Sequence, residues 1–122
     1  IVGRVGKYVY GFDSDKLEEV IANLFIKHNL GISTAESCTA GMLAARLTDV
    51  AGSSTYFKGG SVCYSNELKI NDVGIKKDLI DRYGAVSEEV AGALAKNIAQ
   101  KNNTDIGIGI TGIAGPDGGT EK

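Results

Sequence analysis

The segment TAESCTAG, residues 34–41, places Glu36, Ser37, Cys38 and Thr39 where a predicted strand runs into a predicted helix. Free backbone N–H groups at a helix start can hold an anion or an oxyanion. Ser37 or Cys38 could act there as a nucleophile. The plainer interpretation is that Ser37 or Thr39 caps the helix and that Cys38 is a small buried residue. Taken by itself, this segment favours the plainer interpretation.

A second segment, YSNELK at 64–69, gathers polar side chains at the end of another predicted strand. Lys69 follows Tyr64 by five residues, so one helical turn could return its amine to the strand end. A lysine desolvated in a cleft becomes a usable base. With a single histidine in the chain, a lysine or tyrosine is the natural group to activate a serine. The alternative is that Lys69 pairs with Glu67 or Asp72 on a solvated face, as most surface lysines do.

A third segment, TGIAGPDGG at 111–119, is rich in glycine. Glycine lets backbone amides approach a ligand closely, and a strand followed by such a loop often cradles phosphate. The G-K-[ST] ending of a P-loop is absent, and the run Pro116, Asp117, Gly118 indicates a turn rather than a helix start. A plain connecting loop is an equally good interpretation. Asp117 has no second carboxylate at ligand spacing, so we expect no metal.

The elements that must position these segments alternate between helix and strand. In chain order we expect a helix at 17–28, a strand at 30–35, a helix beginning between Ser37 and Thr39, a strand at 56–64, short helices at 66–73 and 76–83, a helix opening at Ser87, and a strand at 105–111. This alternation predicts an α/β fold, a three-layer sandwich with helices covering a central, mostly parallel sheet. Ligands in such sheets bind beyond the carboxyl ends of the strands, where all three segments would lie.

The element ends carry further expectations. Ser14 and Asp15 are candidate N-caps for the first helix, and Gly31 fits a left-handed cap at its end. The last strand, DIGIGIT, is apolar enough to be buried on both faces. The first thirteen residues are consistent with a short strand or a linker.

Composition excludes several classes of function. Hydrophobic residues make up 43% and charged residues 23%, as in an ordinary globular domain. A net charge of −2 argues against a strongly basic nucleic-acid binder. No apolar run is long enough for a membrane span, and the first residues do not resemble a leader, so we expect neither. Two cysteines are too few for a disulfide scaffold, so we expect a reduced, cytoplasmic protein.

Four motifs taken together resemble a known family. TAESCTAG, YFKGGSVCYSNELK, GAVSEEVA and GITGIAGPDGGTEK are similar, in order and spacing, to the C-terminal domain of CinA, the nicotinamide-nucleotide amidase (NMN deamidase, PncC) family. The resemblance covers residues 14–122. It implies that residues 1–13 are a linker from an upstream CinA domain. It also implies that a further C-terminal strand and helix, present in the family, are missing here.

The resemblance implies hydrolysis of the carboxamide of nicotinamide mononucleotide (NMN) to nicotinate mononucleotide and ammonia, in pyridine-nucleotide salvage. The implied catalytic residues are Ser37 as nucleophile, Lys69 as base and Tyr64 as an assisting group, with backbone amides after Ser37 as the oxyanion hole. The implied substrate-binding residues are Glu36, Thr39, Asn66, Thr111, Gly112 and Gly115. Neither a cofactor nor a metal is implied. Ala40 departs from the glycine that the family commonly has at this position.

Two other readings stay open. The first is a non-catalytic module that binds a pyridine nucleotide or phosphate, for which Ala40 and the missing C-terminal elements argue. The second is a cysteine hydrolase that uses Cys38. The expected partners are the nucleotide substrate and, because the sheet would have an uncovered edge, further copies of the chain. No direct sign of nucleic-acid or membrane binding is present.

Overall fold

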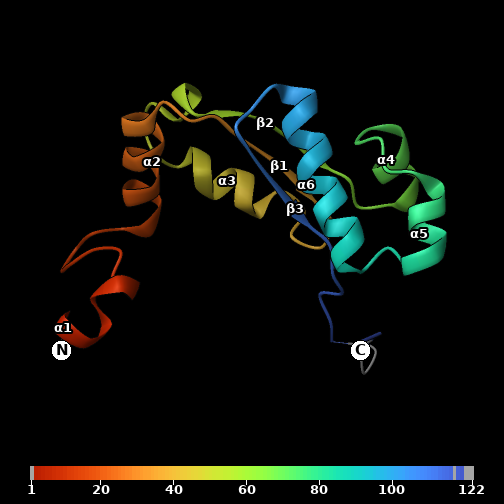
Figure 1. The fold of residues 1–122 in the computed structure, drawn as a ribbon, viewed down its shortest axis with the longest axis horizontal. Coiled ribbons are helices and arrows are strands. Elements are labelled where there is room, and N and C mark those ends of the chain that lie inside the picture. The colour runs from red at the N-terminus through yellow and green to blue at the C-terminus, as the bar shows by residue number, and fades with distance from the viewer. Residues whose placement is uncertain (1, 117, 120–122) are drawn as a thin grey trace.

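The computed structural model describes residues 2–116, 118 and 119 (Figure 1). Its elements, in chain order, are α1 (Val2–Val5), η1 (Gly6–Tyr8), α2 (Leu17–His28), β1 (Ile32–Glu36), α3 (Met42–Thr48), η2 (Ser53–Thr55), β2 (Phe57–Val62), α4 (Asn66–Asn71), α5 (Lys77–Tyr83), α6 (Glu88–Asn102) and β3 (Ile106–Ile110). The strands and the helices α2, α4, α5 and α6 lie where the sequence predicts them, within a few residues. Within the described part of the chain, none of the helices has the length and apolarity needed to span a lipid bilayer.

The three strands form one parallel sheet in the order β2–β1–β3. Glu36, at the end of β1, pairs with Val62 of β2 and with Ile110 of β3, so the carboxyl ends of all three strands meet at one edge. Helices α2 and α3 pack on one face, and α6 packs on the other with α4 and α5 beside it (Figure 1). The fold is therefore the predicted three-layer α/β sandwich, and its site-bearing edge is the one that follows the strands.

Two glycines of β3 bring α6 into direct contact with the sheet. A Cβ added at Gly107 would lie 1.9 Å from the carbonyl oxygen of Ala95, and one at Gly109 would lie 2.2 Å from that of Ala91. No side chain fits in either gap. The alternation in IGIGI thus turns backbone toward α6 and isoleucines toward the layer of α2 and α3.

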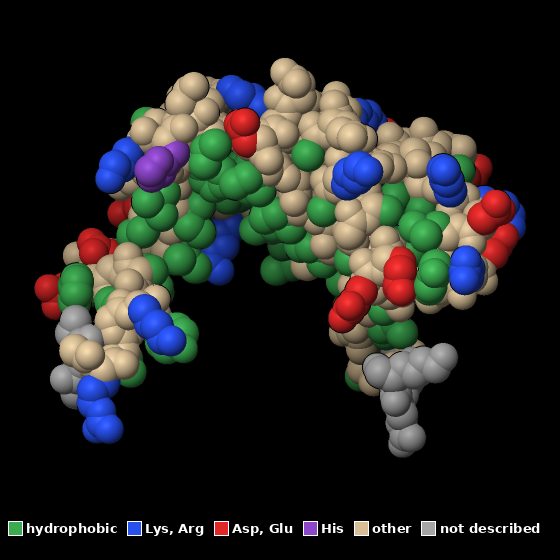
Figure 2. Space-filling model, viewed as in Figure 1, with side chains coloured by type: hydrophobic (Ala, Val, Ile, Leu, Met, Phe, Trp, Pro, Cys, Tyr) green, Lys and Arg blue, Asp and Glu red, His purple; other side chains and the backbone are tan. Residues whose placement is uncertain are grey.

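The expectation that β3 is buried on both faces is wrong. Ile106 is 36% exposed, and the remaining residues of the strand are only half-buried. The reason is that β3 is an edge strand whose isoleucine face is only partly covered by α2. Between α2 and β3 lies an apolar hollow of about 430 Å³, which Ile106 and Ile108 help to line. Figure 2 shows hydrophobic side chains gathered on the concave underside of the molecule.

Helix α2 has the predicted bounds, but the residues that cap its two ends are not the predicted ones. It begins after Lys16, and the carboxylate of Asp15 instead accepts a hydrogen bond from the N–H of Phe12 at 2.9 Å, so neither Ser14 nor Asp15 is its N-cap. At the other end Asn29, with φ of 53°, takes the left-handed position that was expected for Gly31. Asparagine tolerates this conformation better than most residues because its short polar side chain can bond locally.

The chain before α2 is not a strand. It forms the short helices α1 and η1, which stand apart from the sandwich (Figure 1). The aromatic side chains that follow α1, those of Tyr8, Tyr10 and Phe12, are exposed. This segment therefore adds little to the core.

Candidate active site

The carboxyl edge of the sheet brings Ser37 and Lys69 together, 32 residues apart in the chain. Ser37 directly follows β1, and Lys69 lies on α4. The Nζ atom of Lys69 lies 3.0 Å from the Oγ atom of Ser37. Only 2% of the surface of Lys69 and 6% of that of Ser37 are exposed. A buried lysine in contact with a buried serine is the arrangement needed for proton transfer between them.

Helix α4 is built so that Lys69 returns to the strand end. The hydroxyl of Ser65 caps the helix by accepting the N–H of Leu68 at 3.1 Å. One turn later Lys69 reaches back, and its Nζ donates to the carbonyl oxygens of Cys63 at 3.1 Å and Tyr64 at 3.3 Å. With Ser37, these carbonyls give the amine three polar partners, none of which carries a charge.

The alternative of Lys69 in a surface ion pair is wrong. Asp72 is engaged by Lys101 and by the hydroxyl of Ser61, and Glu67 lies exposed on α4. The hydrogen bonds from Lys101 and Ser61 lower the pKa of Asp72. These contacts also fasten the end of α4 to β2 and α6, which helps to hold Lys69 in place.

Ser37 lies at a boundary between sheet and turn. Its N–H donates to the carbonyl oxygen of Ile110 at 2.9 Å, which extends the pairing of β1 with β3 by one residue. The chain then turns, with the N–H of Ala40 donating to the carbonyl of Ser37 at 3.0 Å. The helix α3 begins only at Met42, so the prediction that a helix starts between Ser37 and Thr39 is wrong.

Two consecutive left-handed residues close this turn. The φ angle is 50° at Ala40 and 94° at Gly41. A residue with a Cβ costs about 1–2 kcal/mol in this region, whereas glycine adopts it freely. This gives a physical reason why a glycine suits position 40, and Ala40 is held there at a cost in stability.

The turn leaves backbone donors beside the nucleophile. Among the described residues, the N–H groups of Cys38 and Thr39 donate to no protein acceptor. Beside this turn lies a cavity of about 300 Å³, which Ser37, Cys38, Tyr64 and residues 112–115 line. Free N–H groups next to a nucleophile can stabilise the oxyanion of a tetrahedral intermediate. They belong to a turn, where the sequence predicted a helix start.

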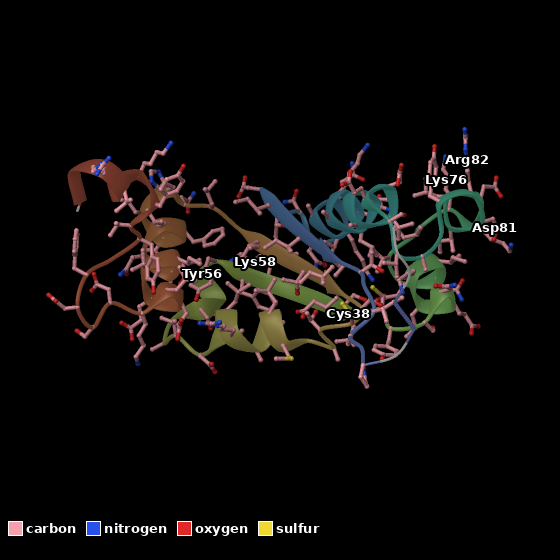
Figure 3. The ribbon with its side chains drawn as sticks, turned by 90° about the horizontal axis from the view of Figure 1, so that it is seen from below. Cys38, Tyr56, Lys58, Lys76, Asp81 and Arg82 are labelled. Atoms are coloured by element: carbon pink, nitrogen blue, oxygen red, sulfur yellow. The ribbon has the colours of Figure 1, made fainter. Side chains whose placement is uncertain are left out.

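Cys38 lies at the carboxyl edge of the sheet, next to Ser37. Figure 3 labels it near the C-terminal loop, with Tyr56 and Lys58 labelled toward the other end of the sheet. The thiol is half-buried, and a Cβ added at Gly112 would lie 3.1 Å from its sulfur. Gly112 therefore lets the loop after β3 pass close to the turn after β1.

Glu36, expected to bind substrate, has both carboxylate oxygens engaged within the protein. Oε1 accepts the N–H of Ala44 at 2.8 Å, and Oε2 accepts the N–H of Leu43 at 3.0 Å and the hydroxyl of Thr39 at 2.7 Å. The side chain is 1% exposed. Burial raises the pKa of Glu36, but the hydrogen bonds from Thr39, Leu43 and Ala44 outweigh it and hold the pKa below its ordinary value.

The other predicted residues lie around the same edge in different ways. Tyr64 is 67% exposed at the cavity, so its ring is free to meet a ligand, while its carbonyl holds Lys69. Asn66, the first residue of α4, is exposed. Gly115, with φ of 64°, lines the cavity. The hydroxyl of Thr111 donates to the carbonyl of Ala85 at 2.7 Å.

The loop after β3 contains Asp117, whose side chain is of a type that can bind a metal. Asp117 is outside the described residues. Across the described part of the chain, no three His, Cys, Asp or Glu side chains come together in a way that could hold a metal ion. The reactive side chains at this edge are the hydroxyls of Ser37 and Tyr64, the thiol of Cys38 and the amine of Lys69.

Comparison with known proteins places this chain in a family. Residues 14–122 match the family model of the CinA C-terminal domain. A CinA-like protein of Dictyoglomus thermophilum is 50% identical over 119 residues, which cover 98% of this chain and 29% of that protein. The chain therefore spans about three-tenths of the length of the curated relatives it matches.

Solved structures agree with the sequence matches. The competence/damage inducible protein CihA from Agrobacterium tumefaciens has a TM-score of 0.83 and 35% identity, covering 93% of this chain and 68% of that one. A CinA superfamily protein from Escherichia coli has a TM-score of 0.82 and 29% identity, covering 94% of this chain and 70% of that one. Both fold and sequence thus point to the same family.

Proposed function

The chain belongs to the CinA C-terminal domain family, and on that premise we propose that it is a nicotinamide-nucleotide amidase. The reaction is hydrolysis of the carboxamide of NMN to nicotinate mononucleotide and ammonia. The observation that carries the proposal is the buried contact of 3.0 Å between Lys69 Nζ and Ser37 Oγ. Hydrolysis of an unactivated amide needs a nucleophile, a base and an oxyanion site, and this edge of the sheet offers a candidate for each.

In the first half of the reaction, Lys69 in its neutral form takes the proton of the Ser37 hydroxyl. The Oγ atom attacks the carboxamide carbon, and the oxyanion that forms accepts hydrogen bonds from the turn N–H groups of Cys38 and Thr39. As the C–N bond breaks, Lys69 returns the proton to the departing nitrogen. Ammonia leaves, and the carbonyl group of the nucleotide remains bound to Ser37 Oγ as an ester.

In the second half, a water molecule takes the place of ammonia. Lys69 accepts a proton from the water, whose oxygen attacks the ester carbon, and then returns the proton to Ser37 Oγ. Nicotinate mononucleotide is released and the site is restored. Tyr64 is suited to orient the ring or relay a proton, because its side chain lies exposed at the cavity.

The rest of the nucleotide would lie along the loop after β3. Gly112 and Gly115 line the cavity and bring backbone amides within reach of a ribose or phosphate. Thr39, Asn66 and Thr111 would add polar contacts: the amide of Asn66 is exposed, and the hydroxyls of Thr39 and Thr111, which donate to Glu36 and Ala85, would serve the nucleotide as acceptors. These contacts are part of the proposal.

The test is release of ammonia from NMN by this chain and by the same chain extended with the C-terminal elements of the family. We expect Lys69→Met, which keeps the volume of the side chain, to lower turnover by about 10²–10⁴-fold, the usual contribution of a general base. The matched control is Lys58→Met. Lys58 Nζ also donates to two carbonyl oxygens, those of Ser54 and Thr55, but it lies well away from Cys38, the residue after Ser37 (Figure 3).

The outcomes separate three cases. Turnover that Lys69→Met abolishes and Lys58→Met leaves unchanged supports the amidase. Turnover only in the extended chain supports the same function and shows that the added elements complete the site. No turnover in either chain, with NMN still bound, overturns the amidase in favour of a nucleotide-binding module.

A further inference from the structure

We propose that Glu36 is a positioning residue for the nucleophile: its buried carboxylate fastens the turn at residues 37–41 to the end of β1 and so sets Ser37 Oγ against Lys69 Nζ. The inference rests on the proposed function, because it takes Ser37 and Lys69 as the reacting pair. It replaces the expected substrate contact of Glu36 with a role inside the protein.

The backbone of Glu36 is fixed by the strand beside it. Its carbonyl oxygen accepts the N–H of Cys63, the residue that follows β2, at 2.8 Å. The next peptide N–H, that of Ser37, donates to Ile110 in β3 at 2.9 Å. The chain is therefore held by both neighbouring strands up to Ser37.

Beyond Ser37 the backbone leaves the sheet, and the side chain of Glu36 holds the turn that follows. Its two oxygens accept from three groups of the following turn and helix, the hydroxyl of Thr39 and the N–H groups of Leu43 and Ala44. These donors lie three to eight residues further along the chain. The carboxylate thus closes a loop around the whole turn and fixes where α3 begins.

The turn needs the contacts of the Glu36 carboxylate because its backbone is strained at one residue. Ala40 has a φ of 50°, which an alanine adopts only when its surroundings hold it there. The backbone bonds within the turn are those of Ala40 to Ser37 and of Met42 to Thr39. Without the carboxylate, the first N–H groups of α3 would lose their acceptor and the turn would be free to shift.

The geometry separates this role from substrate binding. Glu36 is not among the residues that line the cavity, and its oxygens already serve three donors. A change at Glu36 should therefore alter the reactivity of Ser37 more than the affinity for a ligand. The expected signature is a fall in kcat with KM nearly unchanged.

The test measures the reactivity of Ser37 directly. A fluorophosphonate probe, which labels activated serine hydroxyls, is reacted with the unaltered chain and with Glu36→Gln, and labelling of Ser37 is followed by mass spectrometry. Glutamine has the same shape but only one acceptor oxygen for three donors. We expect labelling and kcat for NMN to fall at least tenfold, with KM changed less than threefold. The matched control is Glu19→Gln, an exposed glutamate on α2, which should behave like the unaltered chain.

Every outcome bears on the inference. Equal labelling of Glu36→Gln and the unaltered chain overturns the positioning role and leaves the proposed function standing. No labelling of Ser37, either in the unaltered chain or in the chain extended with the C-terminal elements of the family, overturns the proposed function and this inference with it. If Glu36→Gln does not fold, Thr39→Val removes one donor to the carboxylate and keeps the others. In that variant, slower labelling supports the inference, and labelling at the unaltered rate overturns it.

Discussion

Two nucleophilic side chains stand next to each other at the end of β1, and their surroundings differ. The hydroxyl of Ser37 is in contact with the buried amine of Lys69, whereas the thiol of Cys38 is half-buried beside the cavity and close to Gly112. A base is what turns a hydroxyl into a nucleophile near neutral pH. The contact therefore favours Ser37 as the attacking group.

We predict that Ser37→Ala lowers ammonia release from NMN by at least about 10³-fold, as expected when a nucleophile is removed. Cys38→Ala should keep most of the turnover, since the backbone N–H of residue 38 remains. Ammonia assays on the two purified variants check this. Loss of turnover in Cys38→Ala alone would show that the chain is a cysteine hydrolase.

A second prediction at this scale concerns acid stability. Because the pKa of Glu36 is lowered in the fold, its ionised form stabilises the native state fully above the unfolded-state value of about 4.3. That contribution is lost as the pH falls through the lower pKa of the folded state. We expect the unaltered chain to lose more unfolding free energy between pH 7 and pH 3 than Glu36→Gln does. Urea titrations at both pH values measure the difference, and equal losses would contradict it.

The sequence allows the reacting side chains to be predicted, because they follow the ends of predicted strands. Ser37 and Lys69 follow neighbouring strands, so a parallel sheet had to bring them near each other. The two other partners of Lys69 were not predictable, because they are the backbone carbonyls of Cys63 and Tyr64. The role of Glu36 depends on N–H groups up to eight residues away, which a local motif does not show.

At the scale of elements, the close contact between α6 and β3 depends on two glycines in β3, Gly107 and Gly109. The carbonyl of Ala91 and the amide nitrogen of Ala95 lie 2.2 and 2.6 Å from where a Cβ at Gly109 would be. These atoms are backbone, so they can yield only if the whole helix moves. The helix in turn packs Val90, Leu94 and Ile98 into the core.

We therefore predict that Gly109→Ala lowers the free energy of unfolding by about 3 kcal/mol or more, at or above the upper end of ordinary overpacking. The matched change is Gly92→Ala in α6, where an added Cβ meets nothing within 4 Å. Gly92→Ala should stabilise the helix by about 0.5–1 kcal/mol. Thermal unfolding of both variants checks the pair, and a stable Gly109→Ala would mean that α6 is free to move outward.

The errors in predicting the elements have local causes. The start of α3 was placed too early because Ser37 and Thr39 are common cap residues, while the first free N–H groups are capped by Glu36 from the preceding strand. The strand β3 is less buried than predicted, because an apolar run indicates a strand but does not show that both of its faces are covered. Periodicity gives the type of an element reliably, but its ends and its cover depend on neighbours that are distant in sequence.

At the scale of the whole molecule, the sheet has two edge strands, and the one at β3 borders the apolar hollow beside α2 (Figure 2). Edge strands offer unpaired backbone groups for pairing with another chain, and an uncovered apolar face adds a driving force. We therefore expect this chain to associate with itself.

We predict that Ile106→Lys, which places a charge on the hollow, lowers the degree of association measured by analytical ultracentrifugation across a concentration series. Val86→Lys is the control, because Val86 is an exposed apolar residue that does not line the hollow. Equal association of the unaltered chain and both variants would show that the hollow takes no part.

The peptide of Ser37 marks where the sheet ends, and this has a consequence for how the backbone exchanges hydrogen with solvent. The amide hydrogens of Ser37 and Cys63 are bound across strands, so they should exchange with deuterium only when the sheet itself opens. Those of Cys38 and Thr39 donate to no acceptor among the described residues and should exchange rapidly. Protection against exchange would then end at Ser37, and an anion bound at the site would slow the exchange of the two amides that follow it.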